Sequence, residues 1–286
     1  MKQSVPGDPS HPETVRLMQQ AHQTHFPFKT APNVVDLPPL PANFAVDPQE
    51  SEFIGICRRR TYYGQEGTFT WNWDESTWRA YLNAYYRLTE AADVQVGRLL
   101  EALRQQDLEG STLVLFTSNH GEGMAAHRWV TKLMLYEEPL RVPFIVRWPG
   151  KIPAGVVDGQ HLVSGLDVLL TPCDWAEVYF PQVAGNSLRP LVENPGQEGR
   201  SFLISELHPD TEDLKMQGRM LRTQRFKYVV FSQGQAAEML FDLEADPGET
   251  CNLALDGAWS GELEQHRALL RQWCVHQDDS FASLVA

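Results

Sequence analysis

Hydrophobic residues recur at intervals of three and four between Asp74 and Gln106. This spacing places apolar side chains on one face of a helix, and the positions concerned are Leu82, Tyr85, Leu88, Ala92, Val96, Leu99 and Leu103. Asp74 or Ser76 can accept hydrogen bonds from the first turn as an N-cap. The pattern therefore predicts a long amphipathic helix over 74–106.

Two short apolar runs follow this helix. Thr112–Thr117 and Val142–Trp148 are too short for helices, and continuous apolar runs of this length are typical of strands buried on both faces. Gly110 begins the turn before the first run, and residues 162–178 predict a further helix that Pro172 would interrupt. A helix, a turn and buried strands favour a parallel α/β arrangement.

After Pro195 the pattern changes to short strands with polar breaks. An antiparallel meander is expected, with strands at 201–206, 218–223, 226–231 and 239–243. Apolar positions then predict a closing amphipathic helix over 262–276. The sequence thus divides into two parts. Residues 1–195 would form an α/β part with helices flanking a mixed or parallel sheet, and 196–286 a small antiparallel sheet packed by a helix.

Composition is that of a folded domain without strong class markers. Of 286 residues, 42% are apolar and 21% charged, and the net charge of −13 argues against nucleic-acid binding, because a phosphate backbone needs clustered cations. The four cysteines form no C-x-x-C pair. Met1–Pro12 has no apolar signal segment and no apolar run is long enough to span a bilayer. We expect no membrane partner and a cytoplasmic protein, or a periplasmic or secreted one if an upstream segment is missing.

Polar side chains cluster directly after the first predicted strand. Asn119, His120, Glu122, His127 and Lys132 follow its carboxyl end, where open α/β sheets place their ligands. A single polar loop residue is ordinarily solvated, so the prediction depends on the density of the cluster. Amide oxygens and imidazoles can bind a divalent cation, and a lysine can hold a tetrahedral anion. The sequence predicts a metal and anion site in this loop.

The order of residues in this loop resembles the sulfatases of the alkaline phosphatase superfamily. That family ends a strand in Ser-Asp-His-Gly-Glu and continues with Gly-x-x-x-His, Lys, Tyr-Glu and Arg-Val-Pro. The corresponding residues here are Thr117–Gly123, His127, Lys132, Tyr136-Glu137 and Arg141–Pro143. Two later segments resemble the closing hairpin of the family, Arg222–Tyr228 and Leu240–Ala254. The resemblance extends from about His22 to Ala254 and implies a sulfatase fold.

The resemblance also implies metal-dependent hydrolysis of sulfate esters. Asn119 and His120 would bind Ca²⁺ or Mg²⁺, while Lys132 and His25 would bind the sulfate. Lys132, His25 and His127 would form the catalytic set, with one of the two histidines protonating the departing alkoxide. The expected substrate is a sulfated small molecule or carbohydrate.

Arg141 precedes the second predicted strand and has two alternative roles. It is either a further cation for the substrate or the partner of Glu137 or Glu138 in a structural ion pair, since guanidinium groups suit carboxylates.

Two features of the family are missing from the N-terminal part of this chain. Sulfatases have consecutive aspartates that bind the cation, and a Cys or Ser in C/S-x-P-S-R that is oxidised to the nucleophile, formylglycine; neither feature is present in the N-terminal part of this chain. Asn119 replaces the usual Asp, which removes a negative charge from the metal site. The chain therefore resembles the C-terminal portion of a sulfatase, without the segment that bears the nucleophile. We expect weak metal binding, little or no activity alone, and a missing N-terminal half as a candidate partner.

The absence of further strands predicts an uncovered sheet edge or apolar face. Two other functions remain open. One is a non-catalytic remnant that acts as an anion-binding module, and the other is a phosphatase or phosphonate hydrolase of the same superfamily. The identity of the substrate is not determined by the sequence.

Overall fold

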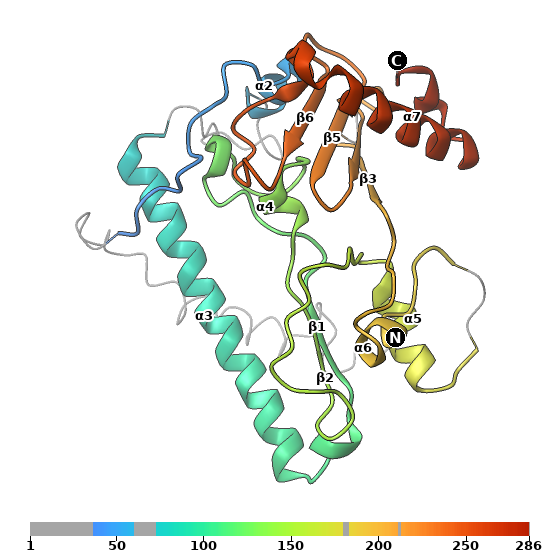
Figure 1. Ribbon diagram of the computed structural model, residues 1–286. Helices are drawn as coiled ribbons and strands as arrows, with labels where there is room; N and C mark the ends of the chain where they lie inside the picture. The colour runs from blue at the N-terminus through green and yellow to red at the C-terminus, as the bar shows by residue number, and fades with distance from the viewer. Residues whose placement is uncertain (1–36, 60–72, 180–182, 211–212, 286) are drawn as a thin grey trace, which may run out of the picture. The chain divides into compact units, whose positions relative to one another are not determined.

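The computed structural model describes residues 37–59, 73–179, 183–210 and 213–285 (Figure 1). The described residues fall into two compact units, one of 37–40 and 73–106 and the other of 41–59, 107–179, 183–210 and 213–285. In the described part of the chain, no helix has both the length and the apolar character needed to cross a membrane.

The first unit contains the predicted long helix, α3 (Glu75–Gln105). Asp74 is its N-cap and accepts a hydrogen bond from the backbone N–H of Thr77 at 2.8 Å, as the sequence predicted. Trp78 and Leu82 near its start are buried, whereas Leu99 is exposed. The periodic pattern thus predicted the helix correctly, but only its first turns are covered.

The second unit contains a two-stranded sheet of β1 (Val114–Thr117) and β2 (Phe144–Arg147). The expected parallel arrangement is wrong for this pair, because the strands are antiparallel with Phe116 opposite Ile145. The chain between them contains only the short helices η5 (Ala126–Arg128) and α4 (Glu137–Leu140). It has no crossover helix to return the chain in the same direction.

The strands β1 and β2 are also less buried than predicted. Phe116 is 41% and Ile145 54% exposed, although the apolar run had indicated a strand covered on both faces. These two cross-strand partners are exposed side by side, and the predicted uncovered apolar face stays a prediction.

The four strands expected after Pro195 form one antiparallel sheet in the order β3-β4-β5-β6. Their bounds are Leu203–Leu207, Gly218–Arg222, Phe226–Phe231 and Glu238–Asp242. The closing helix, α7, spans Ser260–His276. The meander and its helix are therefore confirmed. The remaining α-helices among the described residues are α2 (Glu52–Arg59), α5 (Asp167–Trp175) and α6 (Arg189–Glu193). The helix α5 starts later than predicted and continues past Pro172.

The central strand β5 is buried on both faces because its alternating side chains meet two apolar clusters. Tyr228 and Val230 belong to the cluster that includes Leu270 of α7. Val229 and Phe231 belong to the other, and the latter ring stacks on Phe53 of α2 with centroids 4.4 Å apart. Lys227 directly precedes these four residues in the strand and is 0% exposed. A lysine in this position needs a buried acidic partner.

The apolar cluster that includes Val229 and Phe231 also contains Trp129, Met134, Leu135 and Tyr136, so one core joins residues on both sides of position 195. The domain boundary at 195/196 stays a prediction.

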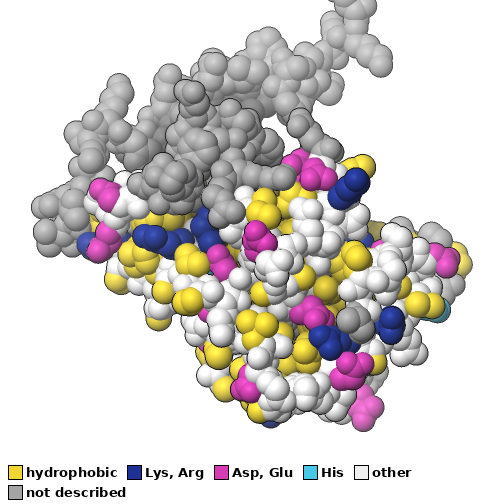
Figure 2. All heavy atoms as spheres, turned by 90° about the horizontal axis from the view of Figure 1, so that it is seen from above, with side chains coloured by type: hydrophobic (Ala, Val, Ile, Leu, Met, Phe, Trp, Pro, Cys, Tyr) yellow, Lys and Arg dark blue, Asp and Glu magenta, His cyan; other side chains and the backbone are white. Residues whose placement is uncertain are grey.

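On the face seen in Figure 2, hydrophobic side chains are interspersed with acidic and basic ones over the described surface.

Candidate functional site

The loop between β1 and α4 is held by close backbone contacts. Gly121 N–H donates to Pro139 O at 2.7 Å and Gly123 N–H to Thr131 O at 2.8 Å. A Cβ on Gly121 would lie 2.0 Å from the carbonyl oxygen of Glu138, which is far inside van der Waals contact. Glycine is required here because two backbone segments approach directly.

The predicted metal ligands are at the start of this loop. Asn119 is exposed and His120 is half-buried. The Nδ1 atom of His120 lies 2.8 Å from Gly121 O, and a carbonyl can only accept, so this nitrogen bears the proton. The Nε2 atom of the neutral ring is then free of hydrogen, which is the form that binds a metal ion.

Asn119 and His120 can supply two ligands, whereas Ca²⁺ takes about six to eight oxygen-rich ligands. The two residues fit part of a cation site. The consecutive aspartates Asp278 and Asp279 do not extend it, because the second pairs with Arg219 at 2.8 Å beyond α7.

The predicted sulfate-binding residue Lys132 is half-buried. Among the described residues, no acidic side chain pairs with its ammonium group. Its carbonyl oxygen accepts a hydrogen bond from the indole Nε1 of Trp129 at 3.1 Å. An unpaired, partly desolvated cation attracts anions.

Of the two predicted catalytic histidines, the structure describes only His127. His25 lies outside the described residues. His127 is 1% exposed, and its ring stacks on Tyr136 with centroids 3.7 Å apart. Burial, with help from Lys227, lowers the pKa of His127 to about 4. Its imidazole is therefore uncharged and enclosed at neutral pH, and a role as proton donor to a substrate stays a prediction that this geometry does not favour.

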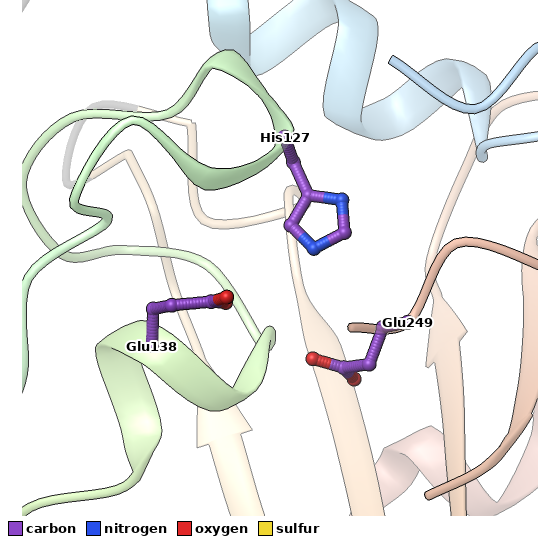
Figure 3. Close-up of side chains that lie close together, drawn as sticks. All are labelled: His127, Glu138 and Glu249. Carbon is purple, nitrogen blue, oxygen red and sulfur yellow. The ribbon is translucent and has the colours of Figure 1, made fainter. Parts of the chain in front are cut away.

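His127 is one of three side chains that converge from separate elements. Figure 3 shows it pointing from η5 toward Glu138 of α4 and Glu249 of the loop after β6. One nitrogen or oxygen atom of each lies within 4.8 Å of the others. By residue type alone, this cluster can bind a transition metal.

The space between these groups already contains hydrogen-bond donors. The Nδ2 atom of Asn43 lies 2.8 Å from Glu138 Oε1 and 3.3 Å from His127 Nε2. The ammonium of Lys227 lies 2.7 Å from Glu249 Oε1, as an ion pair rather than a well-directed hydrogen bond. The nitrogen atoms of Asn43 and Lys227 thus already contact the oxygen and nitrogen atoms that would bind a cation.

Glu249 is 1% exposed and links two parts of the core. Its Oε2 atom accepts a hydrogen bond from the backbone N–H of Glu137 at 2.6 Å. Burial raises the pKa of Glu249 to about 7, although the neighbouring Lys227 opposes the rise. Lys227 also donates to Glu137 Oε1 at 3.2 Å.

The sequence reasoning missed Asn43, Lys227 and Glu249 as members of a site. The available signal was Lys227, a charged residue inside the otherwise apolar strand Phe226–Phe231, which predicts a buried acidic partner.

Arg141 does not form the ion pair considered for it. Glu137 pairs with Lys227, and Glu138 accepts from Asn43. Within the described ranges, the exposed guanidinium of Arg141 has no acidic partner.

Comparison with known families gives two matches. Residues 21–178 match the family described as sulfatase, and residues 125–272 match the one described as N-sulphoglucosamine sulphohydrolase, C-terminal. The chain is 36% identical over 257 residues to the delta 4,5-hexuronate-2-O-sulfatase of Bacteroides thetaiotaomicron. This match covers 87% of the chain and 52% of that protein. The chain thus spans about half the length of this relative.

Solved structures give the same picture. A 2-O GAG (glycosaminoglycan) sulfatase is 34% identical with a TM-score of 0.76, over 86% of this chain and 54% of that one. The phosphonate monoester hydrolase from Silicibacter pomeroyi is 25% identical with a TM-score of 0.72, over 90% of this chain and 54% of that one.

Proposed function

Because the chain belongs to the sulfatase family, we propose that it binds the sulfate group of a sulfated sugar through Lys132, as part of a metal-dependent sulfuric ester hydrolase. The observation that supports this most directly is that Lys132 is a half-buried residue whose ammonium pairs with no acid in the described part of the chain. A cation without an acidic partner among the described residues is available to an anionic ligand.

Asn119 and His120 are the proposed cation ligands of this site. A divalent cation bound there would share the charge of the sulfate oxygens with Lys132. His120 contributes Nε2, because its Nδ1 proton is directed at Gly121 O. Histidine His25 remains the proposed proton donor, and we leave His127 out of the catalytic set because its ring is enclosed.

We propose that this chain alone has little or no turnover. Covalent catalysis needs a nucleophile, and none of the four cysteines stands in C/S-x-P-S-R. The nucleophile would have to come from another segment or another chain.

The proposed substrate class is a 2-O-sulfated uronate sugar. The support is the similarity, over most of this chain, to a delta 4,5-hexuronate-2-O-sulfatase and to a 2-O GAG sulfatase. Such a ligand has a carboxylate as well as a sulfate. The guanidinium of Arg141, which has no acidic partner among the described residues, is a candidate partner for that carboxylate, because the fork of donors in Arg matches two carboxylate oxygens.

A second candidate function is phosphonate monoester hydrolysis. It is favoured by the match to the phosphonate monoester hydrolase over 90% of this chain. The two ligand classes have tetrahedral anions of similar shape, so binding must be compared directly.

Thermal unfolding in the presence of ligands tests the proposal. A 2-O-sulfated unsaturated uronate disaccharide should raise the Tm of the wild-type chain, while the desulfated disaccharide and a phosphonate monoester should have little effect. The Lys132→Met variant should lose the shift. Lys151→Met, which changes an exposed lysine outside the loop, should keep it. Equal shifts with the phosphonate would favour the second candidate, and equal shifts in both variants would contradict the role of Lys132.

Hydrolysis of an aryl sulfate with added Ca²⁺ tests the second part of the proposal. No product is expected. Turnover that Lys132→Met abolishes would contradict the need for a nucleophile from elsewhere.

A further inference from the structure

The loop that leads to Lys132 has an unusual backbone. Six of its residues other than glycine have positive φ, between 50° and 69°: Met124, Ala125, His127, Arg128, Thr131 and Leu133. This left-handed region is unfavourable for side chains with a Cβ, most of all for a β-branched threonine. Such a loop keeps its shape only where surrounding contacts fix it.

We infer that Asn43, Lys227 and Glu249 form a clamp that fixes this loop and so positions Lys132 for sulfate. The inference rests on the proposed function of Lys132. The three residues come from distant parts of the sequence. They contact His127 in the loop, and Glu137 and Glu138 at the start of α4, where the loop ends. None of the three is placed at the sulfate itself, so each is a positioning residue rather than a catalytic one.

The Asn43 side of the clamp holds the middle of the loop. Its backbone oxygen accepts the N–H of His127 at 2.7 Å. Its side-chain Nδ2 lies 2.8 Å from Glu138 Oε1 and 3.1 Å from Gly248 O. One asparagine therefore joins the loop, α4 and the segment after β6.

The Glu249 side holds the end of the loop. Its carboxylate accepts the N–H of Glu137 at 2.6 Å, and Lys227 balances its charge at 2.7 Å. Both side chains are buried within the same core, so water cannot replace either contact without opening that core.

A short chain of contacts connects the clamp to Lys132. The guanidinium of Arg58 donates to His127 O at 3.1 Å and lies 6.0 Å from the centre of the Trp129 ring. The indole N–H of Trp129 then donates to Lys132 O at 3.1 Å. A movement of His127 is expected to reach Lys132 through Trp129.

The clamp residues supply nitrogen groups to the cluster of His127, Glu138 and Glu249. Asn43 offers N–H groups to two of the three residues, and Lys227 offers an ammonium to the third. Binding a metal there would require displacing the amide and placing a second cation beside Lys227, which is electrostatically unfavourable.

The indole N–H of Trp129 provides a reporter that does not depend on activity. Its exchange with solvent can be followed by NMR, after assignment with Trp129→Phe. The indole of Trp148, which donates to Gly110 O at 2.9 Å, serves as internal reference because it makes no contact with the clamp residues in the described structure.

In Asn43→Ala we expect exchange at Trp129 to become about tenfold faster or more, with Trp148 unchanged, because a buried hydrogen-bond partner is lost. Glu249→Gln keeps the shape of the side chain and should give the same direction of change if Asn43→Ala does not fold. The exposed control Asn194→Ala should leave both indoles unchanged. Unchanged exchange at Trp129 in a folded clamp variant would overturn the inference.

Two further measurements separate this inference from the proposed function and from a metal site. The dissociation constant of the 2-O-sulfated disaccharide should rise about tenfold in the same clamp variants. If the wild type binds no disaccharide, the proposed function fails while the Trp129 result still decides the clamp. Titration of the wild type with Zn²⁺ should leave the Trp129 resonance in place; a saturable shift that Glu249→Gln abolishes would overturn the clamp in favour of a metal site.

Discussion

Replacement of Lys227 by methionine removes the cation that faces a buried carboxylate. The methionine keeps most of the apolar stem, so the main change is the loss of the ammonium 2.7 Å from Glu249 Oε1. Both positions are almost completely buried. The variant therefore tests whether the ionisation of Glu249 in the core depends on Lys227.

The expected effect depends on pH in a definite direction. In the wild type, burial raises the pKa of Glu249 from the ordinary value of 4.5 to about 7. Between pH 4.5 and about 7, Glu249 is protonated in the folded state but ionised in the unfolded state. Its contribution to the free energy of unfolding is therefore fully present below pH 4.5 and declines as the pH rises to about 7. Above that pH, the carboxylate ionises beside Lys227 and this contribution stops changing.

Without Lys227, the carboxyl of Glu249 should stay protonated to higher pH. The free energy of unfolding of the variant then continues to fall above pH 7, by about 1.4 kcal/mol per pH unit. Between pH 7 and 8.5, the variant should lose about 2 kcal/mol more free energy of unfolding than the wild type. At pH 5 the difference should be small, because Glu249 is neutral in both proteins and a buried ammonium is itself costly.

Urea denaturation at a series of pH values from 5 to 8.5 measures this difference. The double variant Lys227→Met with Glu249→Gln is the matched control, and its profile should lack the extra slope because no acid remains to titrate. A constant difference between Lys227→Met and the wild type across this range would refute the reasoning, since it would mean that the ionisation of Glu249 does not depend on Lys227.

Three other changes have defined outcomes. Gly121→Ala places a Cβ 2.0 Å from the carbonyl oxygen of Glu138 and should lower the free energy of unfolding by about 1–3 kcal/mol, as measured by urea denaturation. The ring of His161 lies 2.5 Å from Asp158 Oδ2 and 2.8 Å from a backbone carbonyl, and these contacts raise its pKa. NMR titration should therefore give His161 a pKa above the ordinary value of 6.5. The wild type should lose stability relative to His161→Gln as the pH rises through the pKa of the folded state. Asn119→Asp adds a charge to the proposed cation site and should tighten Ca²⁺ binding roughly tenfold, as measured by calorimetry; unchanged affinity would exclude this position as a ligand.

The elements that the sequence predicted well are those with a local signal. The helix α3 and the strands β4 and β5 follow from the spacing of their own apolar residues, and their observed bounds differ from the predicted ones by a residue or so. Asp74 as N-cap is equally local, because the capping contact reaches only to Thr77.

The pairing of β1 and β2 could not be predicted in the same way. An apolar run indicates a strand, but it contains no information on the direction of its partner. The exposure of Phe116 and Ile145 depends on what covers the sheet, which is a tertiary property.

The clamp was missed for a related reason. The contact between Asn43 and Gly248 spans 205 positions in the sequence, and no periodicity connects such distant residues. For His127, the family resemblance suggested a catalytic role. Its ring is instead buried against Tyr136, and this burial, together with the charge of Lys227, lowers its pKa.

The most direct test of the central claim is a crystal structure of the chain with a 2-O-sulfated uronate disaccharide. We predict a sulfate oxygen at about 3 Å from the Nζ atom of Lys132, with the backbone of 121–133 unchanged. A disaccharide whose sulfate lies away from Lys132, with that ammonium still unpaired, would contradict the proposal.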